Sequence, residues 1–79
     1  MRLDKFLKVS RLIKRRTVAN SACDGGRVLI NGKQAKPGAQ LKVGDLITIE
    51  FGEKPVTVRV LMLSETVRKE QADSMYEVL

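Results

Sequence analysis

The apolar residues near the N-terminus recur with the three- and four-residue spacing of a helix that buries one stripe. The positions that share this spacing are Leu3, Phe6, Leu7 and Ser10. The opposite face is polar, and Asp4 in the first turn suits the positive end of the helix dipole. We expect Leu12 and Ile13 to close this helix and turn the chain.

A second, short helix is predicted between a residue that commonly caps helices and a glycine pair that ends them. Thr17 is a good N-cap, and Gly25-Gly26 supplies the left-handed residue that follows many helices. The expected buried face carries Val18, Ala19, Ala22 and Cys23, and the expected outer face carries Asn20, Ser21 and Asp24. Small buried side chains would let this helix lie close to its neighbour.

Alternating apolar and polar residues predict antiparallel strands after the helices. Val28 to Ile30 and Lys33 to Ala35 flank Asn31-Gly32, a pair that readily forms a type I′ turn, so a hairpin is expected. A strand from Leu46 to Phe51 would place Ile47, Ile49 and Phe51 on one face, and Gly52 to Pro55 would reverse the chain into a strand from Val56 to Leu61. In the tail, a short helix that packs back on the sheet is predicted from Ala72, Met75, Tyr76 and Leu79.

The length and composition limit the chain to one small globular domain. Its 79 residues leave no room for a second core. The longest apolar stretch, Val60 to Leu63, is far shorter than the roughly 20 residues of a membrane-spanning helix. The N-terminus lacks the apolar segment of a secretory signal, and the single cysteine cannot form an internal disulfide. We therefore expect a cytoplasmic protein with no membrane partner.

The charge is distributed unevenly along the chain. The whole sequence has a net charge of +6, yet residues 1–36 hold ten basic residues and only two acidic ones, whereas the remainder is slightly acidic. A basic front on a nearly neutral scaffold predicts one polyanion-binding face. Solvated charge that only improves solubility is the alternative.

Three consecutive cations, Lys14, Arg15 and Arg16, precede the second helix, where the free N–H groups already carry partial positive charge. Cations there oppose helix stability by a few tenths of a kcal/mol each, so their placement suggests a function. A phosphate group would resolve the conflict. Further cations are supplied by the first helix (Arg2, Lys5, Lys8 and Arg11) and by the hairpin region (Arg27, Lys33 and Lys36).

The composition argues against catalysis and against recognition by base stacking. The chain has no histidine, one cysteine and no carboxylate cluster near its basic residues, so we expect no enzyme activity, no metal site and no cofactor. Phe6 and Phe51 are both expected in the core, which leaves few aromatic rings to stack on bases. Recognition is therefore expected to rest on phosphates and on RNA shape.

Residues 1–51 resemble the RNA-binding domain named after small-subunit ribosomal protein four. The motifs that carry the resemblance are Arg2-Leu3-Asp4, Ser10-Arg11, Arg16, Gly26 to Gly32 and Gly44-Asp45. The resemblance implies an α+β fold in which two N-terminal helices pack on a small, curved antiparallel sheet. We predict a single domain, 1–79, with a motif core in 1–51 and a C-terminal strand and tail in 52–79.

Because no catalytic domain accompanies these motifs, the chain is most similar to the free-standing bacterial group that contains heat-shock protein fifteen and RqcP. The resemblance implies binding to ribosomal RNA and peptidyl-tRNA on obstructed large ribosomal subunits. It also implies support of C-terminal alanine tailing by a larger peptide-tailing factor, and we expect a monomer. Heat-shock-type recycling of subunits and a general adaptor for tRNA, small RNA, DNA or acidic membranes stay open as alternatives.

The predicted RNA-binding residues have two sources. The family motif contributes Arg2, Asp4, Arg11 and Arg16, and the charge pattern adds Lys5, Lys8, Lys14, Arg15 and Lys33.

Overall fold

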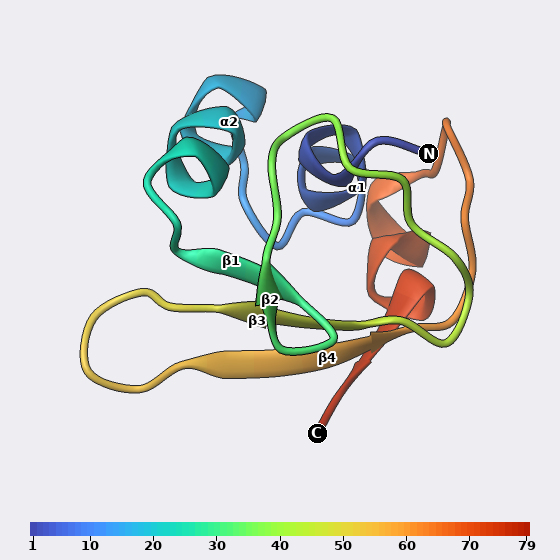
Figure 1. The fold of residues 1–79 in the computed structure, drawn as a ribbon. Coiled ribbons are helices and arrows are strands. Elements are labelled where there is room, and N and C mark those ends of the chain that lie inside the picture. The colour runs from blue at the N-terminus through green and yellow to red at the C-terminus, as the bar shows by residue number, and fades with distance from the viewer.

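The computed structural model describes residues 1–79 as two helices and a short 3₁₀ helix combined with a five-stranded sheet. In chain order the elements are α1 (Leu3–Val9), α2 (Arg16–Asp24), β1 (Val28–Ile30), β2 (Lys33–Gln34), β3 (Leu46–Ile49), β4 (Val56–Val60), η1 (Lys69–Met75) and β5 (Tyr76–Val78). The strand order is β2-β1-β3-β4-β5, and every neighbouring pair is antiparallel. Both α-helices lie on one side of the sheet (Figure 1). The predicted α+β fold class is confirmed.

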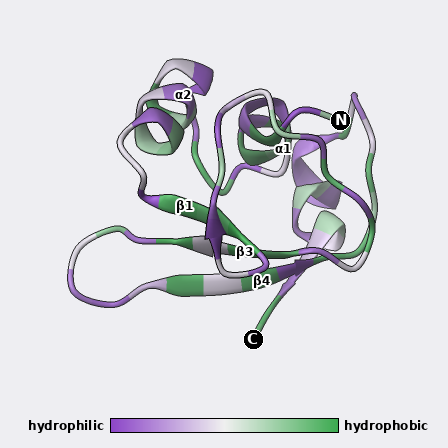
Figure 2. Ribbon diagram, in the orientation of Figure 1, coloured by the Kyte–Doolittle hydropathy of each residue, from purple (hydrophilic) through white to green (hydrophobic).

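The core forms where α1 and α2 meet the sheet. α1 contributes the fully buried Leu3, Phe6 and Leu7, and α2 contributes Ala19, Ala22 and Cys23. Apolar residues concentrate on β1, β3 and β4 beneath the helices, whereas β2 is hydrophilic (Figure 2). No helix combines the length and the apolar character that crossing a bilayer requires.

The β1–β2 hairpin forms at the predicted turn. Asn31 and Gly32 have φ angles of 51° and 84°, the two positive values that a type I′ turn requires. The Asn31 side chain also accepts a hydrogen bond from the Leu46 amide (3.0 Å) and donates one to Asp45 (3.1 Å). The turn is thereby tied to the start of β3.

The second helix begins two residues earlier than the predicted cap implies. Arg15 occupies the N-cap position without a side-chain hydrogen bond to the helix, and Thr17 lies inside the first turn, so the assignment of Thr17 as the cap was wrong. Val18 was also placed wrongly on the buried face, because it is 46% exposed. The buried face centres on Ala19, Ala22 and Cys23, and Val18 lies at the margin of this face.

The third strand is shorter than predicted, and Phe51 lies outside the core. β3 ends at Ile49, which pairs with Val28, the first residue of β1. After that pair one more backbone hydrogen bond joins the two segments, from the Glu50 amide to the Arg27 carbonyl, and the chain then turns toward β4. Phe51 is consequently 43% exposed, so its expected burial was wrong. On the other side of the turn, Val56 is also exposed.

The tail forms a short helix and an additional strand. Ala72 and Met75 are buried on η1, which confirms that a short helix packs back on the fold. Tyr76 does not continue this helix as predicted, and Leu79 also lies beyond it. Tyr76 is extended and pairs with Val60, because β4 otherwise has an unpaired edge.

Candidate nucleic-acid interface

A buried carboxylate connects the N-terminal ends of the two helices. Asp4 is only 2% exposed, and its oxygens accept hydrogen bonds from Arg2 Nε (3.1 Å), Arg16 Nε (3.4 Å) and Asn20 Nδ2 (3.3 Å). The second guanidinium nitrogen of each arginine, Nη2, lies 3.4 Å from the same carboxylate, and the Lys5 amide donates at 2.8 Å. We call Arg2, Asp4, Arg16 and Asn20 the Asp4 cluster.

The surroundings of Asp4 keep its carboxyl group ionised. Burial raises the pKa of Asp4, but hydrogen bonds from Arg2, Arg16 and Asn20, with the charge of Arg16, outweigh burial and hold this pKa below its ordinary value. The cluster therefore carries one negative and two positive charges. The arginine side chains stay 49% and 47% exposed, so each guanidinium can still donate to an external anion.

The loop that follows the hairpin holds the start of α1 in place. The Leu3 and Asp4 amides donate to the carbonyl oxygens of Ala39 (2.8 Å) and Pro37 (3.0 Å). These bonds satisfy donors that the first turn of a helix leaves free. The backbone that follows Arg2 is thus held by the loop after the hairpin.

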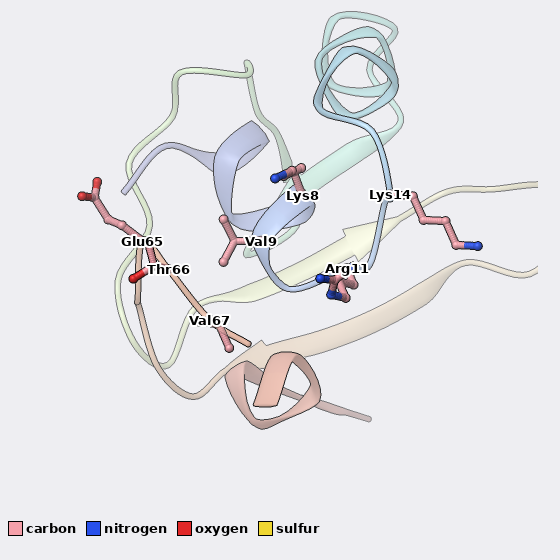
Figure 3. Close-up of a pocket in the computed structure, with 7 residues that line it drawn as sticks. All are labelled: Lys8, Val9, Arg11, Lys14, Glu65, Thr66 and Val67. Carbon is pink, nitrogen blue, oxygen red and sulfur yellow. The ribbon is translucent and has the colours of Figure 1, made fainter. Parts of the chain in front are cut away.

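A second group of cations lines a groove of about 260 Å³ between α1 and the segment that precedes η1. Lys8, Arg11 and Lys14 line it together with Glu65, Thr66 and Val67, and we call it the basic groove (Figure 3). Lys14 and Glu65 extend toward opposite sides in this view. Lys5 does not line the groove, but its ammonium group binds Glu65 at 3.2 Å.

The family model of the S4 domain matches residues 1–47, which include both helices and the β1–β2 hairpin. The chain belongs to the S4 domain family. The matched residues of this S4 domain contain the whole Asp4 cluster and all three cations of the basic groove.

Relatives of this S4 domain protein match over nearly its full length. The protein named RQC P-site tRNA stabilizing factor in Halalkalibacterium halodurans is 59% identical over 78 residues, covering 99% of this chain and 89% of the relative. The protein of the same name in Bacillus subtilis is 58% identical over 79 residues, covering 100% and 92%. The chain therefore falls in the group of S4 domain proteins that carry this name.

Solved structures show the same arrangement. The structure of Vibrio cholerae heat shock protein 15, described as trimeric, superposes with a TM-score of 0.92 at 32% identity. The match covers 100% of this chain and 81% of that protein. The predicted membership in the group of heat-shock protein fifteen and RqcP is confirmed.

The structure gathers most of the predicted binding residues of the S4 domain into two places. Arg2, Asp4 and Arg16 share the Asp4 cluster, and Lys8, Arg11 and Lys14 share the basic groove. Arg15 and Lys33 are exposed on the α2 N-cap and on β2, and they belong to neither group.

Sequence reasoning missed two side chains that bind predicted residues through a hydrogen bond or an ion pair, Asn20 and Glu65. Asn20 lies one helical turn after Arg16, so the spacing places both side chains on the same face of α2, although it does not identify Asp4 as their partner. Glu65 reaches Lys5 across 60 positions of sequence, and no local pattern indicates such a contact.

The only cysteine of the S4 domain supports the fold and carries no exposed thiol. Cys23 is 2% exposed in the core between α2 and its neighbours. Burial, with the nearby carboxylates of Asp4 and Asp24, raises the pKa of this thiol to about 11. A protonated buried thiol is a poor nucleophile, so Cys23 acts as a small core side chain.

Arg11 occupies a backbone conformation that disfavours its own side chain. Its φ of 64° lies in the left-handed region, just after Ser10 caps α1, where glycine is the usual residue. An L residue in this region is less stable than glycine by roughly 1 kcal/mol. Arg11 therefore opposes folding slightly while its side chain lines the basic groove.

We expect Arg11→Gly to raise the free energy of unfolding by about 1 kcal/mol, because glycine adopts this φ without strain. The same change should weaken RNA binding, because the groove loses a cation. Urea denaturation and an affinity measurement give the two values. Arg11→Ala is the matched control, since it removes the side chain but keeps the strain. Equal stability of the two variants would contradict this explanation.

Proposed function

We propose that this S4 domain protein is a non-catalytic factor that binds RNA on obstructed large ribosomal subunits. The observation that carries the proposal is the Asp4 cluster, in which one buried carboxylate orients two half-exposed guanidinium groups. Guanidinium forks suit phosphate oxygens, and prior orientation reduces the entropy lost on binding. The names of the relatives, which refer to stabilisation of a P-site tRNA, support the ribosome as the location.

In detail, the proposal assigns contacts with both ribosomal RNA and peptidyl-tRNA to this small domain. Cations lie in the Asp4 cluster and in the basic groove, and Arg15 and Lys33 add charge outside both. Two separate basic sites suit two RNA elements better than a single straight helix. The protein would act in the cytoplasm as a monomer, and it would support alanine tailing of the stalled peptide by a larger factor.

Catalysis has no support among the residues of the two sites. The only carboxylate in the Asp4 cluster is buried and held by two arginines, and the sequence contains no histidine. No group of three or more potential metal-ligating side chains lies together. We therefore propose binding and orientation of RNA as the role of the two sites.

Sedimentation of a lysate through a sucrose gradient tests the proposal. The protein should migrate with large subunits that still hold peptidyl-tRNA and leave them when that tRNA is released. Recovery only at the top of the gradient at low salt would refute the proposal. Loss of alanine tails from stalled peptides in cells without the protein would separate tailing from the alternative of subunit recycling.

The affinity for these subunits should depend steeply on salt. Eight predicted binding residues are cations, and the carboxylates of Asp4 and Glu65 offset two of them. Neutralisation of about six phosphates predicts a roughly thousandfold loss of affinity between 50 and 200 mM salt. Fluorescence anisotropy with labelled protein measures the slope. A flat response would show that phosphate contacts do not provide the affinity.

A further inference from the structure

A hollow of about 340 Å³ lies beside the C-terminal half of α2, where the chain between β3 and β4 begins. Its lining residues are Val18, Ser21, Ala22, Gly25, Arg27 and Phe51. Val18 and Phe51 were both expected in the core and are both exposed here. The segment that follows Phe51 projects beyond the sheet (Figure 1). The fold thus exposes an aromatic ring and an aliphatic side chain in one hollow.

This hollow lies next to a second hollow that includes part of the Asp4 cluster. Ser21 lines both hollows, and the second, of about 430 Å³, is formed with Asp4, Arg16, Thr17 and Asn20. Arg16 and Ala22 are six residues apart on α2, which corresponds to roughly 9 Å along the helix axis. A strand whose phosphate is bound at Arg16 can therefore place a neighbouring nucleotide in the hollow of Phe51.

The walls of the hollow are fixed to each other by backbone hydrogen bonds through Arg27. The Arg27 amide donates to the Ala22 carbonyl (3.0 Å), and the Arg27 carbonyl accepts from the Glu50 amide (2.7 Å). The end of α2 is thereby held against the end of β3, directly before Phe51. Such a connection positions the ring before any ligand binds.

We infer that this hollow holds an unpaired nucleobase of the bound RNA, stacked on Phe51, with Arg27 beside its phosphate. An exposed aromatic face with an adjacent guanidinium group is the combination that unpaired bases use in proteins. The positive charge of Arg27 and the proximity to the Asp4 cluster favour RNA over an apolar protein segment. The inference deepens the proposed function, because it adds base stacking where the sequence predicted phosphate and shape recognition alone.

The first test needs no ribosome and uses two short RNAs. We expect tetra-adenylate to shift the NMR signals of the Phe51 ring, whereas the same ribose-phosphate chain without bases leaves them unchanged. Equal shifts with both chains would overturn the inference, since the backbone alone would then occupy the site. This result is independent of whether the protein binds large subunits.

The second test compares Phe51→Leu and Phe51→Ala in binding to large subunits that carry peptidyl-tRNA. Leucine keeps apolar volume but has no aromatic face, so both variants should lose affinity roughly tenfold to a hundredfold. Val43→Ala, at another exposed apolar position, is the control and should bind normally. Wild-type affinity of Phe51→Leu would overturn the inference. If only Phe51→Ala lost affinity, the hollow would bind an apolar protein partner instead of a base.

The outcomes distinguish this inference from the proposed function. If both Phe51 variants bind normally while variants of Arg2 and Arg16 do not, the stacking inference fails and the ribosomal function stands. A second copy of the chain is the remaining possible occupant of the hollow, and analytical ultracentrifugation tests it by measuring the oligomeric state. An oligomer that Phe51→Ala dissociates would overturn the inference in favour of self-association through this hollow.

Discussion

The double variant Arg2→Gln, Arg16→Gln is expected to lose a thousandfold to ten-thousandfold in affinity for large subunits. Each guanidinium is oriented by Asp4 and half exposed, so each can form charge-assisted bonds to a phosphate. Hydrogen bonds to charged groups contribute about 1.5–3 kcal/mol each, so two such arginines account for a loss of this size. The slope of log affinity against log salt should also decrease by about two.

Two further variants control for the loss of net charge and for a loss of stability. Lys42→Gln with Lys69→Gln removes the same charge from exposed positions outside both sites and should leave the affinity nearly unchanged. Removal of both arginines leaves the buried Asp4 without its cationic partners and can weaken folding. Adding Asp4→Asn to the double variant removes that buried charge and should restore stability without restoring binding. Recovery of binding in the triple variant would refute the role of the arginines.

The parts of the fold that the sequence predicts well depend on local interactions. The apolar stripe of α1 needs only the helical period, and the hairpin needs only the preference of Asn31-Gly32 for positive φ angles. The end of β3 depends on where a distant partner ends, because Ile49 pairs with the first residue of β1. Phe51 therefore has the alternation of a core residue but no strand to hold it inward.

The tail shows the same limit. The helical spacing of Ala72 and Met75 describes η1 correctly, but Tyr76 pairs with the free edge of β4. Since an extended segment can satisfy its backbone groups on an open sheet edge, tertiary pairing overrides the local helical pattern.

For the site, charge and motif identify the residues but not their partners. The three cations at the start of the second helix, Lys14, Arg15 and Arg16, were interpreted as uncompensated and awaiting a phosphate. Arg16 in fact has an internal partner, because Asp4 reaches it from the other helix. Lys14 and Arg15 retain exposed side chains at this helix start. The motif residues Arg2, Asp4 and Arg16 thus form one unit whose geometry depends on how α1 packs against α2.

The substitution Asp4→Asn should destabilise the protein by about 2–3 kcal/mol at neutral pH. It removes a buried acceptor that two arginines and Asn20 share, although the half-exposed arginines make the loss smaller than for a fully buried pair. A domain of this length has a total stability of roughly 4–12 kcal/mol. Urea denaturation should therefore show a clear decrease in the midpoint.

The stabilisation that Asp4 provides should decrease at acidic pH. The pKa of Asp4 is lower in the folded protein than in the unfolded chain, where it is near its ordinary value of about 4. Its ionised form therefore stabilises the fold fully above about pH 4, and this contribution disappears as the pH falls through the folded pKa. The stability difference between wild type and Asp4→Asn should narrow below pH 4. An unchanged difference at pH 3 would contradict a role of the charge.

Asp4→Asn also separates orientation of the arginines from simple charge attraction. The substitution makes the protein one unit more positive, so attraction to RNA alone predicts tighter binding. If Asp4 acts by orienting Arg2 and Arg16, binding should instead weaken about tenfold, because both guanidinium groups regain freedom that RNA must then restrict. Asp24→Asn is the matched control, since it adds the same charge at an exposed position on α2 and should leave binding equal or slightly tighter. A tighter complex with both variants would show that orientation contributes nothing and that net charge governs the affinity.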